Sequence, residues 1–145
     1  MAEYKVSRSA VIDAPAARIF EILASPGRHP EIDGSGTVRG NSFGPDELTE
    51  DARFGMDMKM FGLPYRMTNR VVEYERDRRI AWRHIGTHRW RYELEELPGG
   101  GTRVTETFDY SRGFSLLYVL GGMPARNARG IEATLVRLKE AAERE

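Results

Sequence analysis

Apolar residues recur along the chain with two different periods, and the changes of period mark the predicted elements. Residues 4–13 read YKVSRSAVID and stop before APAAR, a helix start signal, which predicts a first strand. The next segment predicts a short helix with one buried face and an end at SPG. Its apolar residues at helical spacing are Ala16, Ile19, Phe20 and Leu23. GRHPEIDG is typical of a short helical turn, and SGTVRGNSFGPDELTED of a short strand and a loop.

From residue 52 to about residue 110 the period is two, which predicts consecutive strands. ARFGMDMKMFG alternates apolar residues with Asp57 and Lys59, a pattern that a helix would not produce. PYRMTNRVVEYE, RIAWRHI, HRWRYELEEL and TRVTETFDYS follow, with a hairpin turn at PGGG. The facing of residues 64–76 stays open. Short turns between successive strands indicate an antiparallel meander.

After residue 114 the helical period returns. The apolar piece GFSLLYVLGG is joined through Pro124 to a longer helix, and Gly121, Gly122 and Pro124 should break or kink the helix between the two pieces. The longer piece has one apolar stripe, formed by Ala128, Ile131, Leu135, Leu138 and Ala142. One helix covers only part of a wide sheet, so side chains or a ligand must fill the remaining space.

Length and charge narrow the possible functions. The 145 residues predict one domain, 1–145. Lys and Arg together number 22, as do Asp and Glu, so no net field attracts nucleic acid. The absence of cysteine excludes disulfides and thiolate metal sites. No signal-peptide-like or membrane-spanning run appears, and we expect a soluble cytoplasmic protein without integral membrane association, metal or cofactor.

The element order, together with SRSAVIDAPAARIFEILASPGRHPEIDGSG, NRVVEYERDRRIAWR, GTRVTETFDYS and IEATLVRLKEAAE, resembles the SRPBCC proteins of the START-like helix-grip superfamily. That superfamily includes polyketide cyclase/dehydrase-like proteins and lipid-transfer domains. The resemblance implies an α+β helix-grip fold. It has a curved antiparallel sheet of six to seven strands wrapped around a long C-terminal helix, and two small N-terminal helices near the mouth of a cavity. It implies no particular ligand.

Methionine and aromatic residues on the strand faces are the candidate cavity lining. A Met-rich wall adapts to apolar ligands, and the hydroxyls of tyrosine and the N–H of tryptophan offer oriented hydrogen bonds. An ordinary packed core remains the alternative. The candidates are Phe54, Met56, Met58, Met60, Trp82, Trp90, Tyr92, Phe108 and Tyr110.

His84 and Glu106 are the candidate catalytic residues, because each shares the parity of neighbouring aromatic residues, as does His88. An ionisable group in an apolar pocket must pair or shift its pKa, which is the property of a general acid or base. The alternative is a structural hydrogen bond from His84 to Glu106 or to a backbone group, or a bulge that turns one of the two side chains outward. No nucleophile, oxyanion or metal motif reinforces a catalytic role.

Two further polar groups are interpreted as structural. Arg89 and Arg91 alternate with the aromatic residues, so they are expected on the opposite, solvated face of the sheet rather than at a nucleic-acid site. In GRHPEIDG a helical turn would bring His29 and Asp33 together and turn Glu31 away, which offers too few ligands for a metal. Asp33 is expected to cap the backbone of GSG, and His29 or Ile32 to lie at the cavity mouth.

Three functions follow in order of preference. The first is binding or transport of a medium-sized hydrophobic or aromatic, lipid- or polyketide-like molecule. The second is a polyketide cyclase/dehydrase-type enzyme, with His84 and Glu106 as acid and base and with Tyr92 or Tyr110 orienting the substrate. The third is a protein-interaction module that uses GFSLLYVLGGMPA, around Leu117, to dock a partner or a second copy. The chain is expected to be a monomer or a homodimer.

Overall fold

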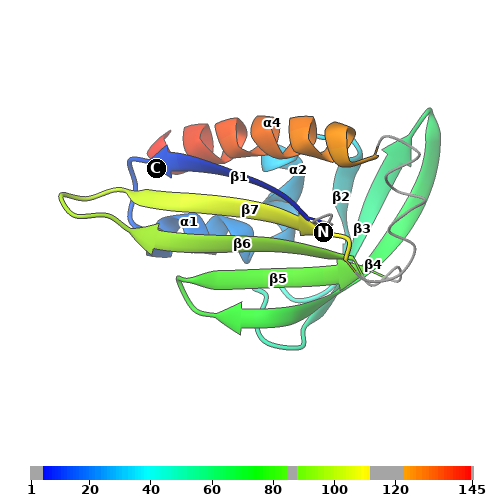
Figure 1. The fold of residues 1–145 in the computed structure, drawn as a ribbon. Coiled ribbons are helices and arrows are strands. Elements are labelled where there is room, and N and C mark those ends of the chain that lie inside the picture. Colours follow the sequence, from blue (N-terminus) through cyan, green and yellow to red (C-terminus); the bar gives the residue numbers. More distant parts are fainter. Residues whose placement is uncertain (1–4, 85–87, 112–122, 145) are drawn as a thin grey trace.

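A computed structural model, which describes residues 5–84, 88–111 and 123–144, contains one seven-stranded antiparallel sheet in the order β1-β7-β6-β5-β4-β3-β2 (Figure 1). This confirms the expected α+β class and the expected strand number. The strands are β1 Lys5–Ile12, β2 Val38–Phe43, β3 Arg53–Met60, β4 Leu63–Glu75, β5 Arg79–His84, β6 Arg89–Glu96 and β7 Thr102–Asp109.

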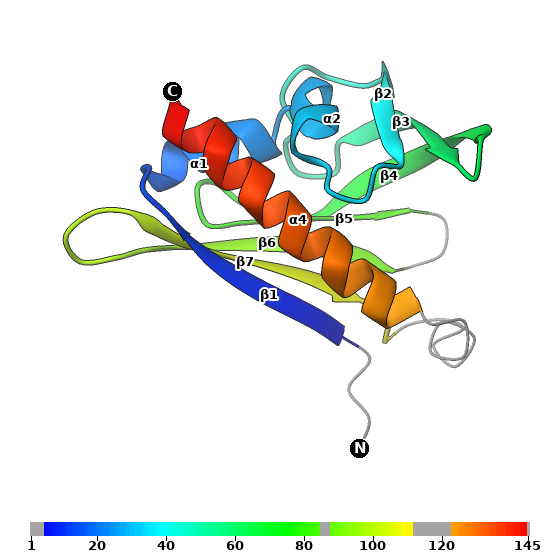
Figure 2. The same ribbon diagram turned by 90° about the horizontal axis from the view of Figure 1, so that it is seen from above.

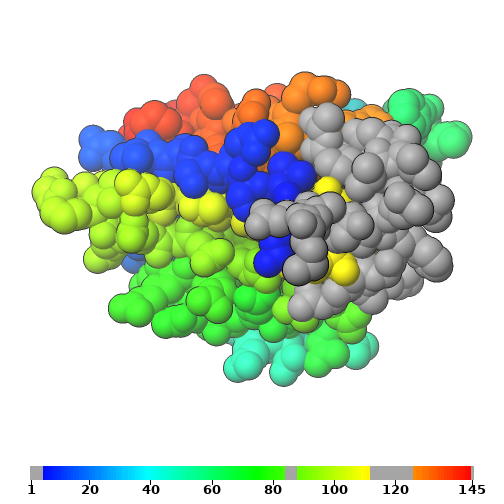
Figure 3. Space-filling model, viewed as in Figure 1, coloured from blue at the N-terminus to red at the C-terminus, as the bar shows by residue number. Residues whose placement is uncertain are grey.

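The helices lie on one face of this sheet, which we call the inner face. They are α1 Ala16–Leu23, the 3-10 turn η1 Pro26–Arg28, α2 His29–Ile32 and the long α4 Met123–Arg144. Seen from above, α4 crosses the end of the sheet formed by β1, β7 and β6, while α2 lies toward β2 (Figure 2). The space-filling view shows α4 alongside β1 (Figure 3). The expected stripe of α4 is buried at all five positions, which are Ala128, Ile131, Leu135, Leu138 and Ala142.

The segment before α4 bears on two expectations. The apolar piece GFSLLYVLGG, with Leu117, Gly121 and Gly122, lies outside the described residues. Pro124 stands in the first turn of α4, where proline costs no intrahelical hydrogen bond. The expected break between two helical pieces, and the interaction surface around Leu117, therefore stay predictions.

The PGGG hairpin sets the register of β6 and β7. Gly99, Gly100 and Gly101 all have positive φ, a conformation that glycine adopts without strain, and the Leu97 N–H donates to the Gly101 carbonyl (3.0 Å). Strand β6 pairs with β7 so that Tyr92 lies opposite Glu106. The turn predicted from the sequence is confirmed, and it places these two polar side chains side by side on the inner face.

A β-bulge decides the facing of β4, which the sequence left open. The register with β5 shifts between Val71 and Glu73. Val71 is buried before the bulge, and after it Tyr74 packs edge-on against Phe20 of α1 (5.6 Å between ring centroids) while Glu73 faces outward. A bulge inserts one residue and so exchanges the two faces of the strand. One strand can therefore line the cavity at one end and contact α1 at the other.

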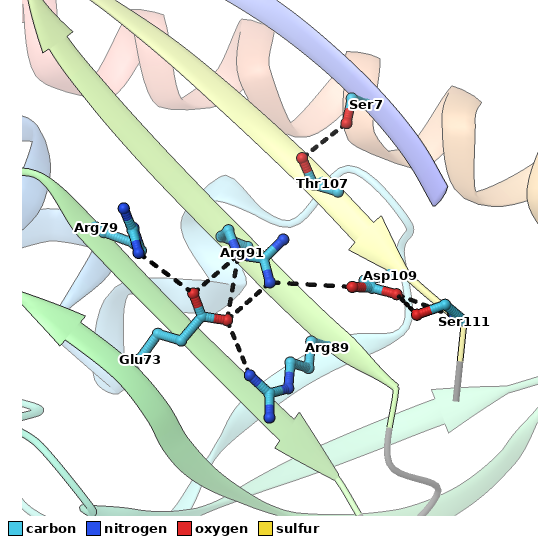
Figure 4. Close-up of polar contacts among 8 residues, drawn as sticks. All are labelled: Ser7, Glu73, Arg79, Arg89, Arg91, Thr107, Asp109 and Ser111. Carbon is cyan, nitrogen blue, oxygen red and sulfur yellow. Dashed lines mark hydrogen bonds and ion pairs between the residues drawn. The ribbon is translucent and has the colours of Figure 1, made fainter. Parts of the chain in front are cut away.

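The arginines of HRWRY lie on the outer face, as expected, but they are paired rather than freely solvated (Figure 4). Glu73 of β4 accepts hydrogen bonds from Arg89 (3.0 Å) and Arg91 (2.8 Å), and Arg79 lies 3.8 Å away. The hydrogen bond with Arg91 lowers the pKa of the Glu73 carboxyl and keeps it ionised. All three arginines lie within ion-pair distance of Glu73, so none of them is a freely solvated cation of the kind expected at a nucleic-acid site.

Gly34 fixes the distance between α4 and the loop that follows α2. Its N–H donates to Thr134 Oγ1 (2.8 Å), and a Cβ at this position would lie 2.4 Å from the Thr134 backbone nitrogen and 2.5 Å from Ala133 Cβ. Since backbone atoms of a packed helix yield little, any side chain larger than hydrogen must push the loop and the helix apart.

We expect Gly34→Ala to lower the free energy of unfolding by about 1–3 kcal/mol, the usual cost of overpacking. Gly27→Ala is the matched control, because a Cβ at Gly27 meets nothing within 4 Å, and its effect should stay within about 0.5 kcal/mol. Urea unfolding followed by circular dichroism measures both. Equal stability of the two variants would contradict the close packing at Gly34.

Candidate functional site: a cavity between sheet and C-terminal helix

A cavity of about 430 Å³ lies between the inner face of the sheet, α2 and the first half of α4. Its side chains come from every strand except β1 and from both helices. The residues that line it are His29, Ile32, Asp33, Gly34, Ser35, Thr37, Val38, Phe54, Met56, Met58, Met60, Tyr65, Met67, Asn69, Trp82, Trp90, Tyr92, Glu106, Phe108, Arg126, Asn127, Arg129, Gly130, Ile131 and Thr134.

Most of the residues singled out in the sequence line this cavity. They are His29, Ile32, Phe54, Met56, Met58, Met60, Trp82, Trp90, Tyr92, Glu106 and Phe108. Tyr110 does not, because it is buried with its ring stacked on Phe108 (5.7 Å), so the expected contact of Tyr110 with a ligand has no geometric support. The backbone of His84 ends β5 opposite Asn69, but its side chain lies outside the described part of the structure.

Two groups of aromatic rings line the wall between α2 and β7. His29 stacks on Trp82 at 4.9 Å, and Phe54 meets Trp82 edge-on at 5.6 Å. Trp90 lies on Phe108 at 4.4 Å on the neighbouring strands. Such contacts hold the rings in fixed positions, and their outer surfaces leave a rigid apolar lining. His88 packs behind this wall, 5.7 Å from Phe108, and does not reach the cavity.

His29 is a neutral, structural part of the wall. Its Nε2 lies 2.7 Å from the Leu23 carbonyl, so the tautomer with a proton on Nε2 donates to the C-terminal end of α1. Burial lowers the pKa of His29, although the hydrogen bond to Leu23 and the charge of Asp33 act in the opposite direction. The ring thus serves as an aromatic surface and ties α2 to α1 without carrying a charge near neutral pH.

Glu106 and Tyr92 form the polar part of the inner wall. Glu106 is 2 % exposed and Tyr92 5 %, and the Tyr92 hydroxyl donates a hydrogen bond to the Glu106 carboxyl group. The Oε1 atom of Glu106 is buried and has no hydrogen-bond partner. Burial raises the pKa of Glu106 to about 8, the Tyr92 hydrogen bond acts against this rise, and the charge of Asp33 adds to it. At neutral pH the carboxyl group is therefore mostly protonated.

Asp33 is a site residue that the sequence indicated only as a backbone cap. Its Oδ1 accepts from the Ser35 N–H (3.1 Å) and its Oδ2 from the Val38 N–H (3.1 Å), which fixes the loop between α2 and β2. This is the cap expected in GSG, extended to the start of β2. Asp33 also lines the cavity and keeps a negative charge near the pair formed by Glu106 and Tyr92.

The remaining polar lining residues escaped the sequence analysis because their elements meet only in the fold. Asn69 of β4 and Thr134 of α4 are buried polar residues within apolar patterns. Arg126 and Arg129 are exposed residues of α4 that lie at the cavity rim, and the Arg126 guanidinium sits 5.1 Å from the ring centroid of Phe61 at the tip of the β3–β4 hairpin. Polar residues on an amphipathic helix carry no local signal that distinguishes a cavity rim from bulk solvent.

The described residues place limits on other chemistry. Among them no group of three or more His, Asp or Glu side chains could hold a metal ion. Within the same part of the chain, no helix is both long and apolar enough to cross a membrane.

The raised pKa of Glu106 predicts a pH-dependent stability. Between its ordinary value of 4.5 and about 8, the folded protein keeps a proton that the unfolded chain has lost. The free energy of unfolding should thus fall as the pH rises through this window, by at most about 1.4 kcal/mol per pH unit, and level off above it.

Glu106→Gln removes this titration, so the variant should not lose stability as the pH rises from 5 to 8.5, whereas the wild type should. The free energy of unfolding of the variant minus that of the wild type should therefore increase over this range. Urea unfolding at several pH values measures the difference. Glu93→Gln is the matched control, since Glu93 is exposed on the same strand pair, and its difference from the wild type should stay nearly constant with pH. Parallel curves for wild type and Glu106→Gln would contradict the protonated state of Glu106.

Comparisons with known proteins agree with this architecture. The family model described as "Polyketide cyclase / dehydrase and lipid transport" matches residues 3–143. A protein of Mycobacterium tuberculosis strain H37Rv, named "Uncharacterized protein Rv0088", is 48 % identical over 141 residues, which cover 94 % of this chain and 63 % of that protein. The chain thus spans just under two thirds of the length of this relative.

Solved structures share the fold at low sequence identity. Protein NE0264 from Nitrosomonas europaea has a TM-score of 0.75 and 16 % identity, with 99 % of this chain and 97 % of that chain covered. The AHSA1-like protein from Aeromonas hydrophila has a TM-score of 0.70 and 19 % identity, with 97 % and 92 % covered. The match along nearly the whole chain places the protein in the polyketide cyclase/dehydrase and lipid transport family, of the SRPBCC type with a helix-grip fold.

Proposed function

We propose that this chain binds and carries a medium-sized apolar or aromatic molecule, lipid- or polyketide-like, in the cavity between the sheet and α4. The observation that carries the proposal is the cavity itself, because about 430 Å³ falls within the range of ordinary ligand pockets, roughly 300–1,000 Å³. A space of this size in a close-packed protein has a cost unless something occupies it.

The composition of the wall supports an apolar ligand. Met56, Met58 and Met60 follow one another on β3, and Met67 of β4 joins them. Flexible thioether side chains adjust to ligands of varied shape, whereas the ring wall around Trp82 offers a fixed stacking surface. Arg126 and Arg129 are exposed lining residues, so the lining of the cavity reaches solvent at these positions.

The setting of this carrier belongs to the same proposal. We take it to act in the cytoplasm, as a monomer or a homodimer, without nucleic acid and without integral membrane association. Because the chain corresponds to only 63 % of its curated relative's length, the activity of the whole protein is part of the proposal as well.

A second candidate function is catalysis of the polyketide cyclase/dehydrase type, and Glu106 is the observation that favours it. A buried carboxyl group with a pKa near 8 can deliver a proton at neutral pH and can accept one in its ionised fraction. Its partner in this hypothesis is His84, whose backbone lies opposite the cavity-lining Asn69. Tyr92 would orient a substrate carbonyl beside Glu106.

The carrier function predicts that filling the cavity blocks binding. We expect 2-isopropenylnaphthalene to bind the wild type in equilibrium dialysis, and Met58→Trp to weaken its binding at least about tenfold, since the larger ring occupies ligand space. Lys59→Trp is the matched control, because Lys59 is the exposed neighbour on the opposite face of β3, and it should bind like the wild type. No binding to the wild type, or equal losses in both variants, would contradict the proposal.

The enzyme function predicts proton abstraction beside a carbonyl group. In D₂O the wild type should exchange the methyl protons of 2-acetylnaphthalene for deuterium faster than buffer does, with a C–H bond broken, its proton taken by the base and a deuteron returned from solvent. NMR measures the exchange. Glu106→Gln should abolish the acceleration, whereas Glu93→Gln should keep it. A wild type no faster than buffer, or an equally fast Glu106→Gln, would rule out this role of Glu106.

A further inference from the structure

We propose that Glu106 and Tyr92 form a subsite that binds a neutral hydrogen-bond acceptor of the ligand, such as a ketone, aldehyde or ester oxygen, and that this subsite discriminates against carboxylate ligands. The inference rests on the proposed carrier function and narrows the class of ligand that it takes.

The geometry of the strand pair leaves one hydrogen-bonding position open. Tyr92 and Glu106 are directly opposite each other on β6 and β7, and both line the cavity. Tyr92 acts on the carboxyl group of Glu106, and the Oε1 atom of Glu106 is buried without a hydrogen-bond partner. A polar atom that is buried without a hydrogen-bond partner destabilises the protein, because its hydrogen bonds to water are lost and not replaced. A ligand that supplies the missing partner therefore gains affinity.

The charges around Glu106 do not stabilise its ionised form, because no basic side chain among the described residues pairs with it. Arg8 is its cross-strand neighbour on β1, but the Arg8 guanidinium pairs with Glu132 of α4 (2.9 Å). Among the described residues, no basic side chain forms an ion pair with Glu106. The charged group that acts on it is Asp33, which is negative and disfavours ionisation further.

The other titratable groups at the cavity do not alter this balance. His29 of α2 is neutral because burial lowers its pKa, and burial together with Glu106 raises the pKa of Tyr92 well above 10. Arg126 and Arg129 of α4 are exposed at the rim. Glu106 is thus the group at the β6–β7 wall that titrates near neutral pH, and the charge of Asp33 acts on it.

The protonated carboxyl group specifies the chemistry of its partner. In the proposed subsite the protonated carboxyl group of Glu106 acts as the O–H donor at the open position beside Oε1. A carbonyl oxygen complements this donor. A carboxylate would bring a second negative charge next to Asp33 in an apolar surrounding, where the cost of removing it from water is not offset by a cation.

Three probes of nearly equal shape test the subsite: 2-isopropenylnaphthalene, 2-acetylnaphthalene and 2-naphthoate, which present a methylene, a ketone oxygen and a carboxylate. Equilibrium dialysis at pH 6.5 should give the ketone about tenfold higher affinity than the alkene, which corresponds to one good hydrogen bond. The carboxylate should bind more weakly than the alkene. Equal affinities, or a preference for 2-naphthoate, would overturn the inference.

Substitutions separate a neutral donor from an ionised carboxylate. Glu106→Gln keeps a neutral group with an N–H donor, so the preference for the ketone should persist within about threefold. Glu106→Met removes the donor at similar size, and the ketone should then bind no better than the alkene. Glu93→Gln, on the outer face of the same strand pair, should behave like the wild type. Loss of the preference in Glu106→Gln would overturn the neutral-donor role.

The wild type provides a test that needs no variant to fold. The advantage of the ketone over the alkene should be constant below about pH 7 and disappear above about pH 9, because the ionised carboxyl group has no proton to donate. An advantage that is independent of pH would overturn the inference. Failure of the alkene and the ketone to bind at all would overturn the proposed function, and the inference with it, whereas equal binding of all three probes would overturn the inference alone.

Discussion

One amphipathic helix has to cover a sheet that is much wider than the helix, and the site follows from this mismatch. A helix with its side chains is roughly 10 Å across, whereas seven strands about 4.8 Å apart extend over roughly 30 Å. α4 is packed at the end formed by β1 and β7, and α1 covers part of β6. Much of the inner face of β2 to β5 is left to α2 and to the cavity, although Tyr74 of β4 contacts α1. Gly34 keeps α2 and α4 in contact, so this remaining space is enclosed on one side rather than open to solvent.

The position of the free space determines what surrounds the buried carboxyl group. Glu106 belongs to β7, a strand whose other inner residues, such as Val104, pack into the core. At this point of the strand the wall of the cavity begins, so the side chain faces neither water nor a basic partner among the described residues. The raised pKa is therefore a consequence of the same mismatch that creates the cavity. A helix shifted further across the sheet would have filled the space and left no room for a polar group.

The sequence predicted those features of this arrangement that depend on the pattern within a single helix or strand. It did not predict those that arise only when separate elements pack together. Period-two alternation identified Phe54 and the three methionines of β3, and the three-four spacing of α4 identified its buried stripe, because both patterns depend on one element alone. Strand facing after residue 71 was out of reach, since a bulge exchanges the faces and leaves no residue signature. Asp33, Asn69 and Arg129 were missed as lining residues because they meet only when separate elements pack. The pairing of Tyr92 with Glu106 was accessible in principle, since both lie seven residues from Gly99 of the predicted hairpin turn.

Proton binding, ligand binding and stability meet in one residue. A buried carboxyl group that lacks a partner destabilises the protein whenever it must ionise, and a well-packed apolar residue at the same position would avoid this cost. Its presence in a largely apolar wall, with Oε1 buried and without a hydrogen-bond partner, is a local feature that costs stability. Features of this kind concentrate at functional sites, where a ligand supplies the missing partner. Met58 and Trp82 explain how the cavity can accept an apolar ligand, but these side chains would accept many different apolar ligands. The unpaired Oε1 is the feature that gives the cavity a chemical preference.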